Sequence, residues 1–366
     1  MYIWELPDWP LLRWNEGRLS EALGAARHRQ GYLLGRMDAL GFRLREEASL
    51  KAMTEDALDT SEIEGVTLNR AQVRSSVARR LGIDVAGLIP AEQDVEGIVE
   101  IMVDATQQFD RPLTKERLFG WHAALFPTGR SGMTKIAVGR WRDDKKGPME
   151  VVAGPVGRER VHFTAPPALR LDIEIERFLA WFNDDHNLDP VLKAGEAHLW
   201  FVTIHPFDDG NGRIARAVAD MVLARAEQTR QRFYSMSSQI RQERVRYYDV
   251  LEHTQKGTLD ITGWLEWFLG CFTRSIVRAQ DLLGSVLRKA RFWEKHAAKV
   301  LNQRQIKVLN RLLDGFEGHM TTSKWASIAR CSQDTAHRDI VDLIAGGVLR
   351  KNPSGGRSTS YSLVVD

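Results

Sequence analysis

The sequence predicts a mainly α-helical protein that one β-hairpin interrupts and a small module of helices and strands follows. Apolar residues recur every three or four positions through most of the first 290 residues, which is the period of helices with one buried face. Residues 139–167 are instead rich in glycine, proline and β-branched residues, as hairpins are. After about residue 300 the helices shorten, and two strand-like runs follow.

The helical period places the elements in order along the chain. Leu19, Leu23 and Leu33 mark one or two helices in the first stretch, and Gly65 suits the left-handed position just after the second. The run MEVVAGPVGRERVHFTAPP predicts the hairpin, with its turn near Gly154 and Gly157. Helices are expected at about residues 16–46, 47–61, 91–108, 114–124, 167–186, 191–203, 211–228, 240–255 and 260–290.

The C-terminal segment has a different order of elements. Helices are expected at residues 303–313, 322–329 and 333–344, and two short strands surround the Ser-Gly-Gly tip of the run VLRKNPSGGRSTSYSLV. This order is typical of a winged helix-turn-helix. We therefore expect an N-terminal helical domain at 1–90, a helical core at 91–290 and a winged helix-turn-helix at 291–366.

Composition narrows the class of protein. The 366 residues carry a net charge of only +3, and the two cysteines, Cys271 and Cys331, have no metal-site spacing. The N-terminus lacks the basic start and apolar run of a signal peptide, and no apolar run approaches the ~18 residues of a membrane span. A cytoplasmic protein without membrane contact is expected. Residues 286–366 hold 14 Lys and Arg against 7 Asp and Glu, which indicates a polyanion partner.

The run HPFDDGNGRIARA, residues 205–217, carries the most chemistry. It joins two apolar helices. Gly210 and Gly212 allow successive backbone amides to form an anion nest at a helix N-terminus. Arg213 and Arg216 lie three apart, roughly on one helix face, and two arginines beside such a nest suit a polyphosphate. Asp209 can hold Mg²⁺ against phosphate oxygens.

His205 adds a general base to this group, because it stands just before the loop. The run lacks the Gly-Lys-Ser/Thr ending of a P-loop and the second set of carboxylates of a two-metal nuclease. A histidine at a helix end or a Gly-Asn-Gly turn is usually structural when it stands alone. The combination predicts phosphate chemistry on an acceptor that must lose a proton.

The run HPFDDGNGRIAR resembles the signature of the Fic family, His-Pro-Phe-x-Asp/Glu-Gly-Asn-Gly-Arg-x-x-Arg, at every specified position. The similarity extends over about residues 45–285. It implies a helical core with a β-hairpin flap, and transfer of AMP from ATP to a Ser, Thr or Tyr hydroxyl of a protein.

The resemblance also implies a role for each motif residue. His205 would take the proton from the attacking hydroxyl, and Asp209 would bind Mg²⁺ between the α- and β-phosphates. Asn211 would hold the α-phosphate, with the amides of Gly210 and Gly212 around it. The β-phosphate would lie on Arg213 and the γ-phosphate on Arg216, where charge develops on the leaving pyrophosphate.

Two further regions acquire roles from the resemblance. The hairpin would pair by its main chain with the target segment, through Val151, Val152, Ala153 and Gly154; an ordinary surface hairpin is the alternative. Tyr247 and Tyr248 would line the adenine pocket with Gln255, although tyrosines on an amphipathic helix are more often packing residues.

The segment TSEIEG, residues 60–65, resembles the Fic inhibitory motif Ser/Thr-x-x-x-Glu-Gly/Asn. The resemblance assigns Thr60, Glu64 and Gly65 to it. Glu64 would pair with Arg216 and so occupy the arginine that should hold the γ-phosphate. The position ahead of the core fits the subclass with an N-terminal inhibitor.

Several alternatives stay open. In the C-terminal module, Gln333, Thr335, Arg338 and Arg357 are candidate DNA contacts, yet winged helices also bind proteins. The chain could be a DNA-binding regulator that senses nucleotides, or a Fic enzyme that removes AMP. The intact His205 favours transfer, since a sensor needs no base. The target protein, self-modification and a homodimer are not decided by the sequence.

Overall fold

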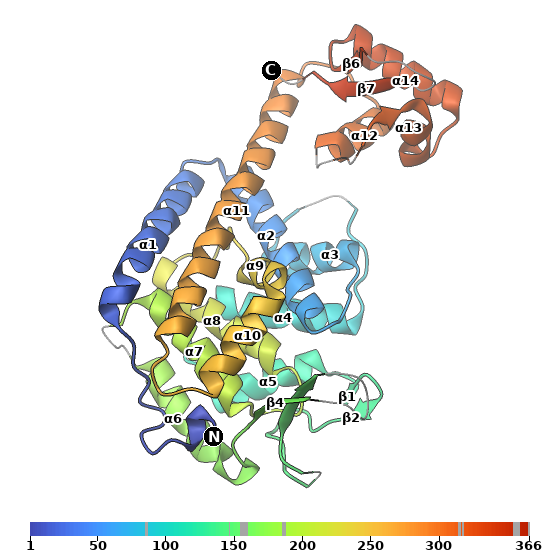
Figure 1. Cartoon of the computed structure of the whole chain (residues 1–366). Coiled ribbons are helices and arrows are strands. Elements are labelled where there is room, and N and C mark those ends of the chain that lie inside the picture. Colours follow the sequence, from blue (N-terminus) through green and yellow to red (C-terminus); the bar gives the residue numbers. More distant parts are fainter. Residues whose placement is uncertain are drawn as a thin grey trace. The chain divides into compact units, whose positions relative to one another are not determined.

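The computed structural model of the chain describes residues 1–84, 87–145, 147–153, 160–184, 188–313, 316, 318–353 and 359–364. The prediction of a mainly helical protein is confirmed, because the strands are few and short. The chain divides into two compact units, Met1–Ala279 and Gln280–Asp366 (Figure 1). No described helix combines the length and hydrophobicity that a membrane span requires.

Unit 1 begins with a short 3-10 helix, η1 (Ile3–Glu5), and two long helices, α1 (Glu16–Asp38) and α2 (Phe42–Ile63). The break between the long helices lies at Gly41, the N-cap of α2, and so earlier than the break expected near residue 46. The next helix, α3 (Arg70–Leu81), was not predicted. Its arginines and serines weaken the apolar period, but an Asn69 cap and a left-handed Gly82 bound it.

The core of unit 1 surrounds α7 and α8, which pack against each other along their lengths. Residues 194–204 of α7 are all buried, so the apolar run AHLWFVTI lies inside the unit. The helix expected at 240–255 is two helices, because the chain turns at Glu243. The helices of this part are α4 (Gln93–Gln107), α5 (Lys115–Leu125), α6 (Leu171–Asn183), α7 (Pro190–Ile204), α8 (Asn211–Glu227), α9 (Met236–Gln242), α10 (Arg244–Gln255) and α11 (Thr262–Lys295).

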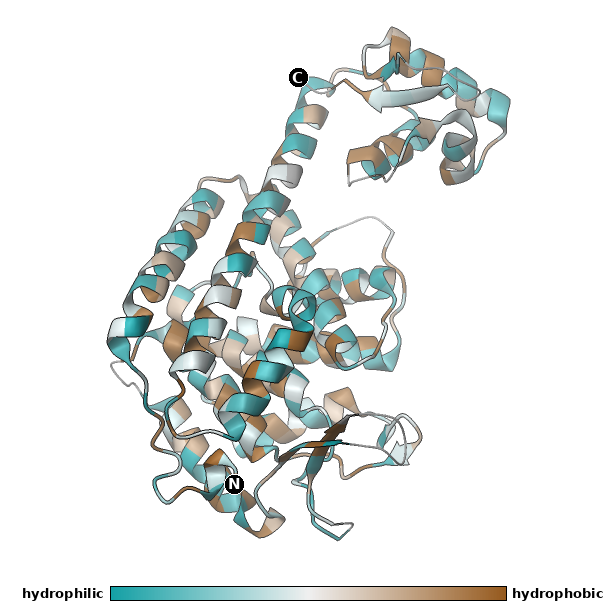
Figure 2. Ribbon diagram, in the orientation of Figure 1, coloured by the Kyte–Doolittle hydropathy of each residue, from teal (hydrophilic) through white to brown (hydrophobic). Residues whose placement is uncertain are grey.

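Hydropathy follows the helical period in the folded chain. Figure 2 shows hydrophobic and hydrophilic residues alternating along the turns of α11, as in a helix with one apolar face. In its first turns, Trp264, Phe268 and Phe272 are almost fully buried. Glu266 lies on the other side of α11 and pairs with Arg18 of α1.

The predicted β-hairpin is present. Strands β3 (Glu150–Ala153) and β4 (Arg160–Thr164) are antiparallel, with Val151 opposite Phe163. The connecting residues 154–159 lie outside the described part of the chain, and with them the predicted docking residue Gly154. A smaller pair, β1 (Arg130–Ser131) and β2 (Thr134–Lys135), was not predicted. Two-residue strands leave no alternating pattern long enough to detect.

Unit 2 contains the predicted order of short helices and strands. Its elements beyond α11 are α12 (Gln303–Leu313), β5 (Met320–Thr321), α13 (Thr322–Ala329), α14 (Gln333–Ala345), β6 (Leu349–Lys351) and β7 (Ser360–Leu363). The unpredicted β5 makes a three-stranded antiparallel sheet of order β5-β7-β6. Its core contains the fully buried Trp325 together with Ile340 and Leu349.

Candidate active site

The predicted motif forms the loop between α7 and α8. His205 ends α7 in the left-handed conformation, with φ 51° and ψ 58°, and Gly210 precedes α8 with φ 83°. A left-handed backbone is costly for a side chain with a Cβ, so the fold must hold His205 there. The Asn211 side chain closes the loop: it accepts a hydrogen bond from the Phe207 amide at 3.0 Å and donates one to the Phe207 carbonyl at 2.8 Å.

His205 is set up to accept a proton. Its Nδ1 lies 3.1 Å from the carbonyl oxygen of Val202. A carbonyl only accepts hydrogen bonds, so Nδ1 carries the hydrogen and Nε2 keeps its lone pair. Burial lowers the pKa of His205 to about 4, and the charge of Arg142 also lowers it. The ring is therefore neutral near pH 7, as a general base must be.

The two carboxylates of the loop, Asp208 and Asp209, have different hydrogen-bond partners. Asp209 is 41% exposed at its side chain, accepts a hydrogen bond from Ser131 Oγ, and lies 3.9 Å from an Arg213 nitrogen. Asp208 accepts from the Ala137 amide at 2.8 Å. In the described ranges no three His, Cys, Asp or Glu residues form a metal-binding group. A single carboxylate fits Mg²⁺ that completes its shell with waters and substrate phosphates.

The N-terminus of α8 carries two buried arginines. The Arg213 guanidinium stacks over the Phe126 ring at 5.1 Å, and burial lowers the pKa of Arg213. Arg216 is 2% exposed at its side chain. Arg213 Nε and Arg216 Nη1 find no hydrogen-bond partner within the described residues. A buried donor without a partner costs ~1–3 kcal/mol. The site is therefore suited to an anion that accepts hydrogen bonds from both donors.

The TSEIEG segment, residues 60–65, reaches Arg216. Arg216 donates from Nε to Thr60 Oγ1 at 2.7 Å and from Nη2 to Glu64 Oε1 at 2.6 Å. Glu64 also lies against Gly212 so closely that a Cβ there would overlap its Oε1. Gly65 follows with φ 81°, a conformation that glycine adopts without strain. The structure thus brings Thr60 and Glu64 to Arg216, which lies 156 and 152 residues further along the chain.

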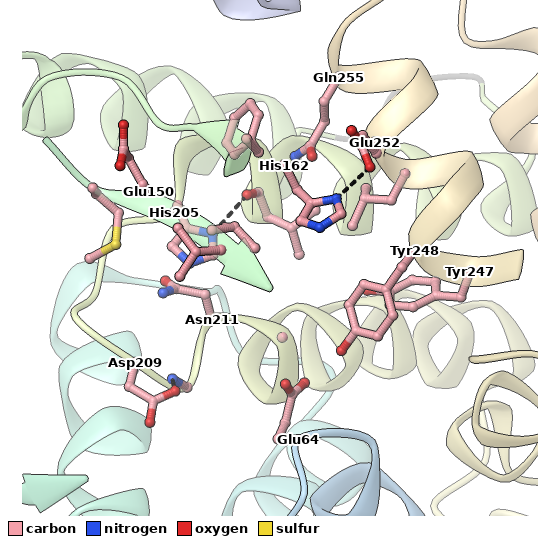
Figure 3. A pocket seen from close by; sticks show the side chains of 18 of the residues that line it. Glu64, Glu150, His162, His205, Asp209, Asn211, Tyr247, Tyr248, Glu252 and Gln255 are labelled. Carbon is pink, nitrogen blue, oxygen red and sulfur yellow. Dashed lines mark hydrogen bonds and ion pairs between the residues drawn. The ribbon is translucent and has the colours of Figure 1, made fainter. Parts of the chain in front are cut away.

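A cavity of about 610 Å³ opens in front of the motif. Figure 3 shows His205 and Asn211 on one side, Glu64 entering from α2, and Tyr247 and Tyr248 from α10 opposite. The hairpin forms a further wall through residues that include Val151, Val152 and Phe163. The cavity is thus bounded by the motif, Glu64 at the end of α2, the hairpin and α10.

The three residues expected to line an adenine pocket differ in how far they are exposed to solvent. Tyr247 is buried, and its hydroxyl lies 2.9 Å from His198 Nε2. Gln255 is also buried and donates to Thr203 Oγ1 at 3.2 Å. Tyr248 is 37% exposed, and its ring centre lies 5.0 Å from that of Tyr247. Tyr247, Tyr248 and Gln255 all line the cavity, and Tyr248 is the most exposed of the three.

The sequence analysis missed Arg142, which holds the loop between α7 and α8. This buried arginine donates from Nε to the carbonyl of His205 at 2.7 Å, and its amide donates to the carbonyl of Pro206 at 3.0 Å. Its other nitrogens reach the carbonyl of Pro166 beyond β4 and the carboxylate of Asp144. Arg142 therefore links the strained His205 to the base of the hairpin.

His122 is a second missed residue. Its Nδ1 accepts from the Gly139 amide at 3.2 Å, so Nε2 carries the hydrogen and donates to the carbonyl of Asp209, also at 3.2 Å. The ring stacks on Phe207 with centres 4.1 Å apart. Burial lowers the pKa of His122 to about 4. Only the backbone acceptors and donors of the folded chain reveal this role.

The remaining predicted residues lie in unit 2. Gln333 and Arg338 are exposed on α14, whereas Thr335 is half-buried and its hydroxyl lies 2.9 Å from that of Ser332, the N-cap of the helix. Arg357 lies outside the described residues. The exposed Asp334 and Asp342 share the helix, so its surface carries both signs of charge.

Two family models match separate segments of unit 1. Residues 112–223 match the model of the Fic/DOC family, and residues 2–83 match that of a domain of unknown function, DUF4172. The chain is 26% identical over 242 residues to the protein adenylyltransferase Fic of Culex quinquefasciatus, which covers 63% of this chain and 42% of that one. With its namesake from Drosophila virilis the identity is 28% over 218 residues, covering 58% and 40%. The chain thus spans less than half the length of these relatives.

A solved structure shares the fold. A Fic family protein from Desulfovibrio desulfuricans G20 superimposes with a TM-score of 0.53 and 19% identity, over 95% of this chain and 96% of that one. At this identity the likeness speaks for the fold alone.

Proposed function

Because the chain belongs to the Fic/DOC family, we propose that it is a protein adenylyltransferase, which transfers AMP from ATP to a Ser, Thr or Tyr hydroxyl of a target protein. The observation that carries the proposal is the arrangement at the start of α8. Arg213 and Arg216, two buried arginines with unfilled donors, follow Gly212 on α8. His205, whose Nε2 keeps its lone pair, lines the cavity together with Asn211 and Gly212. This arrangement suits a triphosphate and an acceptor that must be deprotonated.

In the proposed reaction the target hydroxyl gives its proton to His205 Nε2 as its oxygen attacks the α-phosphorus. The bond from this phosphorus to the α,β-bridging oxygen breaks, and pyrophosphate leaves with the electron pair. Arg213 and Arg216 stabilise the charge that develops on the pyrophosphate. Asp209 would hold Mg²⁺, which neutralises charge on the phosphates when bound.

Glu64 keeps this site inactive in the proposed scheme. Its carboxylate neutralises Arg216 and fills the space above Gly212, where the end of the triphosphate would lie. ATP could still enter the cavity, but with its α-phosphorus out of line for attack. The hairpin would present the outer edge of β3 to the target segment, since β3 pairs only with β4 in the described sheet.

Unit 2 would be a winged helix-turn-helix that binds DNA. The order of α12, α13, α14 and the β6–β7 pair supports this assignment, and so do the exposed Gln333 and Arg338. Binding should weaken steeply with salt. Double-stranded DNA that fails to bind unit 2 at low salt would leave a protein partner as the better assignment.

Two radioactive ATP preparations test the main proposal. Protein carrying Glu64→Gly is incubated with Mg²⁺ and with ATP labelled either at the α- or at the γ-phosphate. We expect label on protein, the chain itself included, from the α-position only, and none with His205→Ala added. Label from the γ-position would show phosphate transfer, and label that His205→Ala does not remove would exclude the proposed base.

A further inference from the structure

The N-terminal arm, residues 2–13, lies against the hairpin that walls the cavity. Trp4 donates from its indole nitrogen to the carbonyl of Thr164 at 2.8 Å, and the Thr164 hydroxyl donates to Tyr2 Oη at 3.2 Å. The Tyr2 ring meets the Phe163 ring edge-on, with centres 5.1 Å apart. Phe163 is itself a buried wall of the cavity. The arm therefore contacts β4 through both backbone and side chains.

The arm is fixed to the rest of unit 1. Trp9 is buried and donates to the buried carboxylate of Glu174 at 2.8 Å, and Glu174 pairs with Arg170. The Arg170 guanidinium in turn lies 5.4 Å from the centre of the Trp4 ring. Arg13 exchanges backbone hydrogen bonds with Leu259 and Ile261 at 2.8 Å each. Both tryptophans are thus held by one ion pair, and the arm cannot shift without breaking buried contacts.

The same arm reaches the opposite wall. The helix η1 packs against α10, which carries Tyr247 and Tyr248. A second link joins β4 to α10 directly, because Arg160 and His162 both bind Glu252, and the Arg160 distance is 2.8 Å. Arm, β4 and α10 form a closed group of three. A two-stranded hairpin is marginally stable by itself, so the position of this one depends on such neighbours.

We propose that Tyr2 and Trp4 are positioning residues that hold β4 against α10 and thereby set the hairpin at the distance from His205 that target docking requires. This inference rests on the proposed function, and it assigns a role to part of the segment that matches a domain of unknown function. The N-terminal domain would then act on the site twice, by restraint through Glu64 and by support through the arm.

Hydrogen exchange of the full chain tests the support without any activity. The readout is the exchange of backbone amides in residues 160–166, whose Ala165 amide is bonded to the Met149 carbonyl at 2.9 Å. Trp4→Phe removes only the indole donor, and we expect exchange there to quicken by roughly 3-fold to 10-fold, as the loss of one net hydrogen bond permits. Trp4→Ala removes the stacking as well and should exceed this.

Trp121→Phe is the matched control. Trp121 is a buried tryptophan of unit 1, and its indole nitrogen also donates a hydrogen bond, to Asp104 at 2.6 Å. Trp121→Phe should leave the amide hydrogen exchange of residues 160–166 unchanged. Unchanged exchange there in both folded Trp4 variants would overturn the proposal, and so would equal acceleration by Trp121→Phe.

A second experiment measures activity, with Glu64→Gly protein as both enzyme and acceptor. Adding Trp4→Phe should lower AMP incorporation about 3-fold or more while the dissociation constant for ATP changes less than about 2-fold, since the arm supports docking rather than the triphosphate end. An equal loss of ATP affinity would contradict a docking role. If Glu64→Gly protein transfers AMP neither to itself nor to any added protein, the proposed function fails, and hydrogen exchange still decides the role of the arm.

Discussion

Replacing Glu64 with glycine should release the site, and the structure gives the size of the effect. Glu64 Oε1 lies 2.6 Å from Arg216 Nη2, and the two side chains are 28% and 2% exposed. A charge-assisted hydrogen bond of this kind contributes ~1.5–3 kcal/mol net. A γ-phosphate must displace it to reach Arg216. At ~1.4 kcal/mol for each factor of ten, we expect AMP transfer to rise by about 10-fold to 100-fold.

The same substitution should change stability in a way that ATP corrects. Glu64→Gly leaves the buried Arg216 without its counter-charge, which is destabilising, although the hydrogen bonds to Thr60 remain. The melting temperature without nucleotide should fall. Mg²⁺-ATP should then raise it further than it raises that of the unmodified chain, because the triphosphate supplies the missing charge.

The assay is the initial rate of AMP incorporation from α-labelled ATP at matched protein concentration. Glu62→Gly is the control, because Glu62 stands two residues earlier on α2 and pairs with Arg241 rather than with Arg216. It should leave the rate unchanged. The double variant Glu64→Gly with Arg216→Ala should lose the gain. Equal rates for the unmodified chain and Glu64→Gly would refute the reasoning, and a fall in rate would indicate that Glu64 serves catalysis itself.

Three other outcomes follow from the contacts around the motif. Arg142→Lys should lower kcat about 10-fold or more with ATP affinity nearly unchanged. Arg142 uses three separate nitrogens to reach His205, Asp144 and Pro166, and a lysine offers all its donors from a single nitrogen. Steady-state kinetics with kcat unaltered would contradict a positioning role. Since the pKa of His205 is lowered to about 4, its ring should stay neutral as pH falls through the ordinary value of ~6.5, and an NMR titration that shows a midpoint near that value would contradict the structure. Truncation after Ala279, the last residue of unit 1, should leave AMP transfer intact, and a truncated chain with native-like circular dichroism but no transfer would show that the later residues take part.

The motif could be predicted because its chemistry is local. His205, Asp209, Arg213 and Arg216 lie within one loop and the first two turns of a helix, so their spacing alone brings them together. Glu64 is different. Two glutamates at a helix end are unremarkable in composition, and only the resemblance to an inhibitory motif linked residue 64 to residue 216. The ion pair between them is now seen at 2.6 Å.

Other features could not be predicted because they depend on the backbone of the folded chain. Arg142 and His122 bind carbonyls and amides, which every residue carries, so no side-chain pattern singles them out. The arm escaped for the same reason, since Trp4 binds the Thr164 carbonyl 160 residues away. The apolar period continues from α9 into α10, although the chain bends between them at Glu243. The period therefore predicts one helix where the structure has two.

The intact mass of purified Glu64→Gly protein after incubation with ATP and Mg²⁺ tests the central claim most directly. The account predicts a mass increase equal to one or more AMP groups, absent when His205→Ala is added and absent without ATP. No increase on the chain, together with no α-label on any added protein, would contradict the assignment of this site as one that transfers AMP.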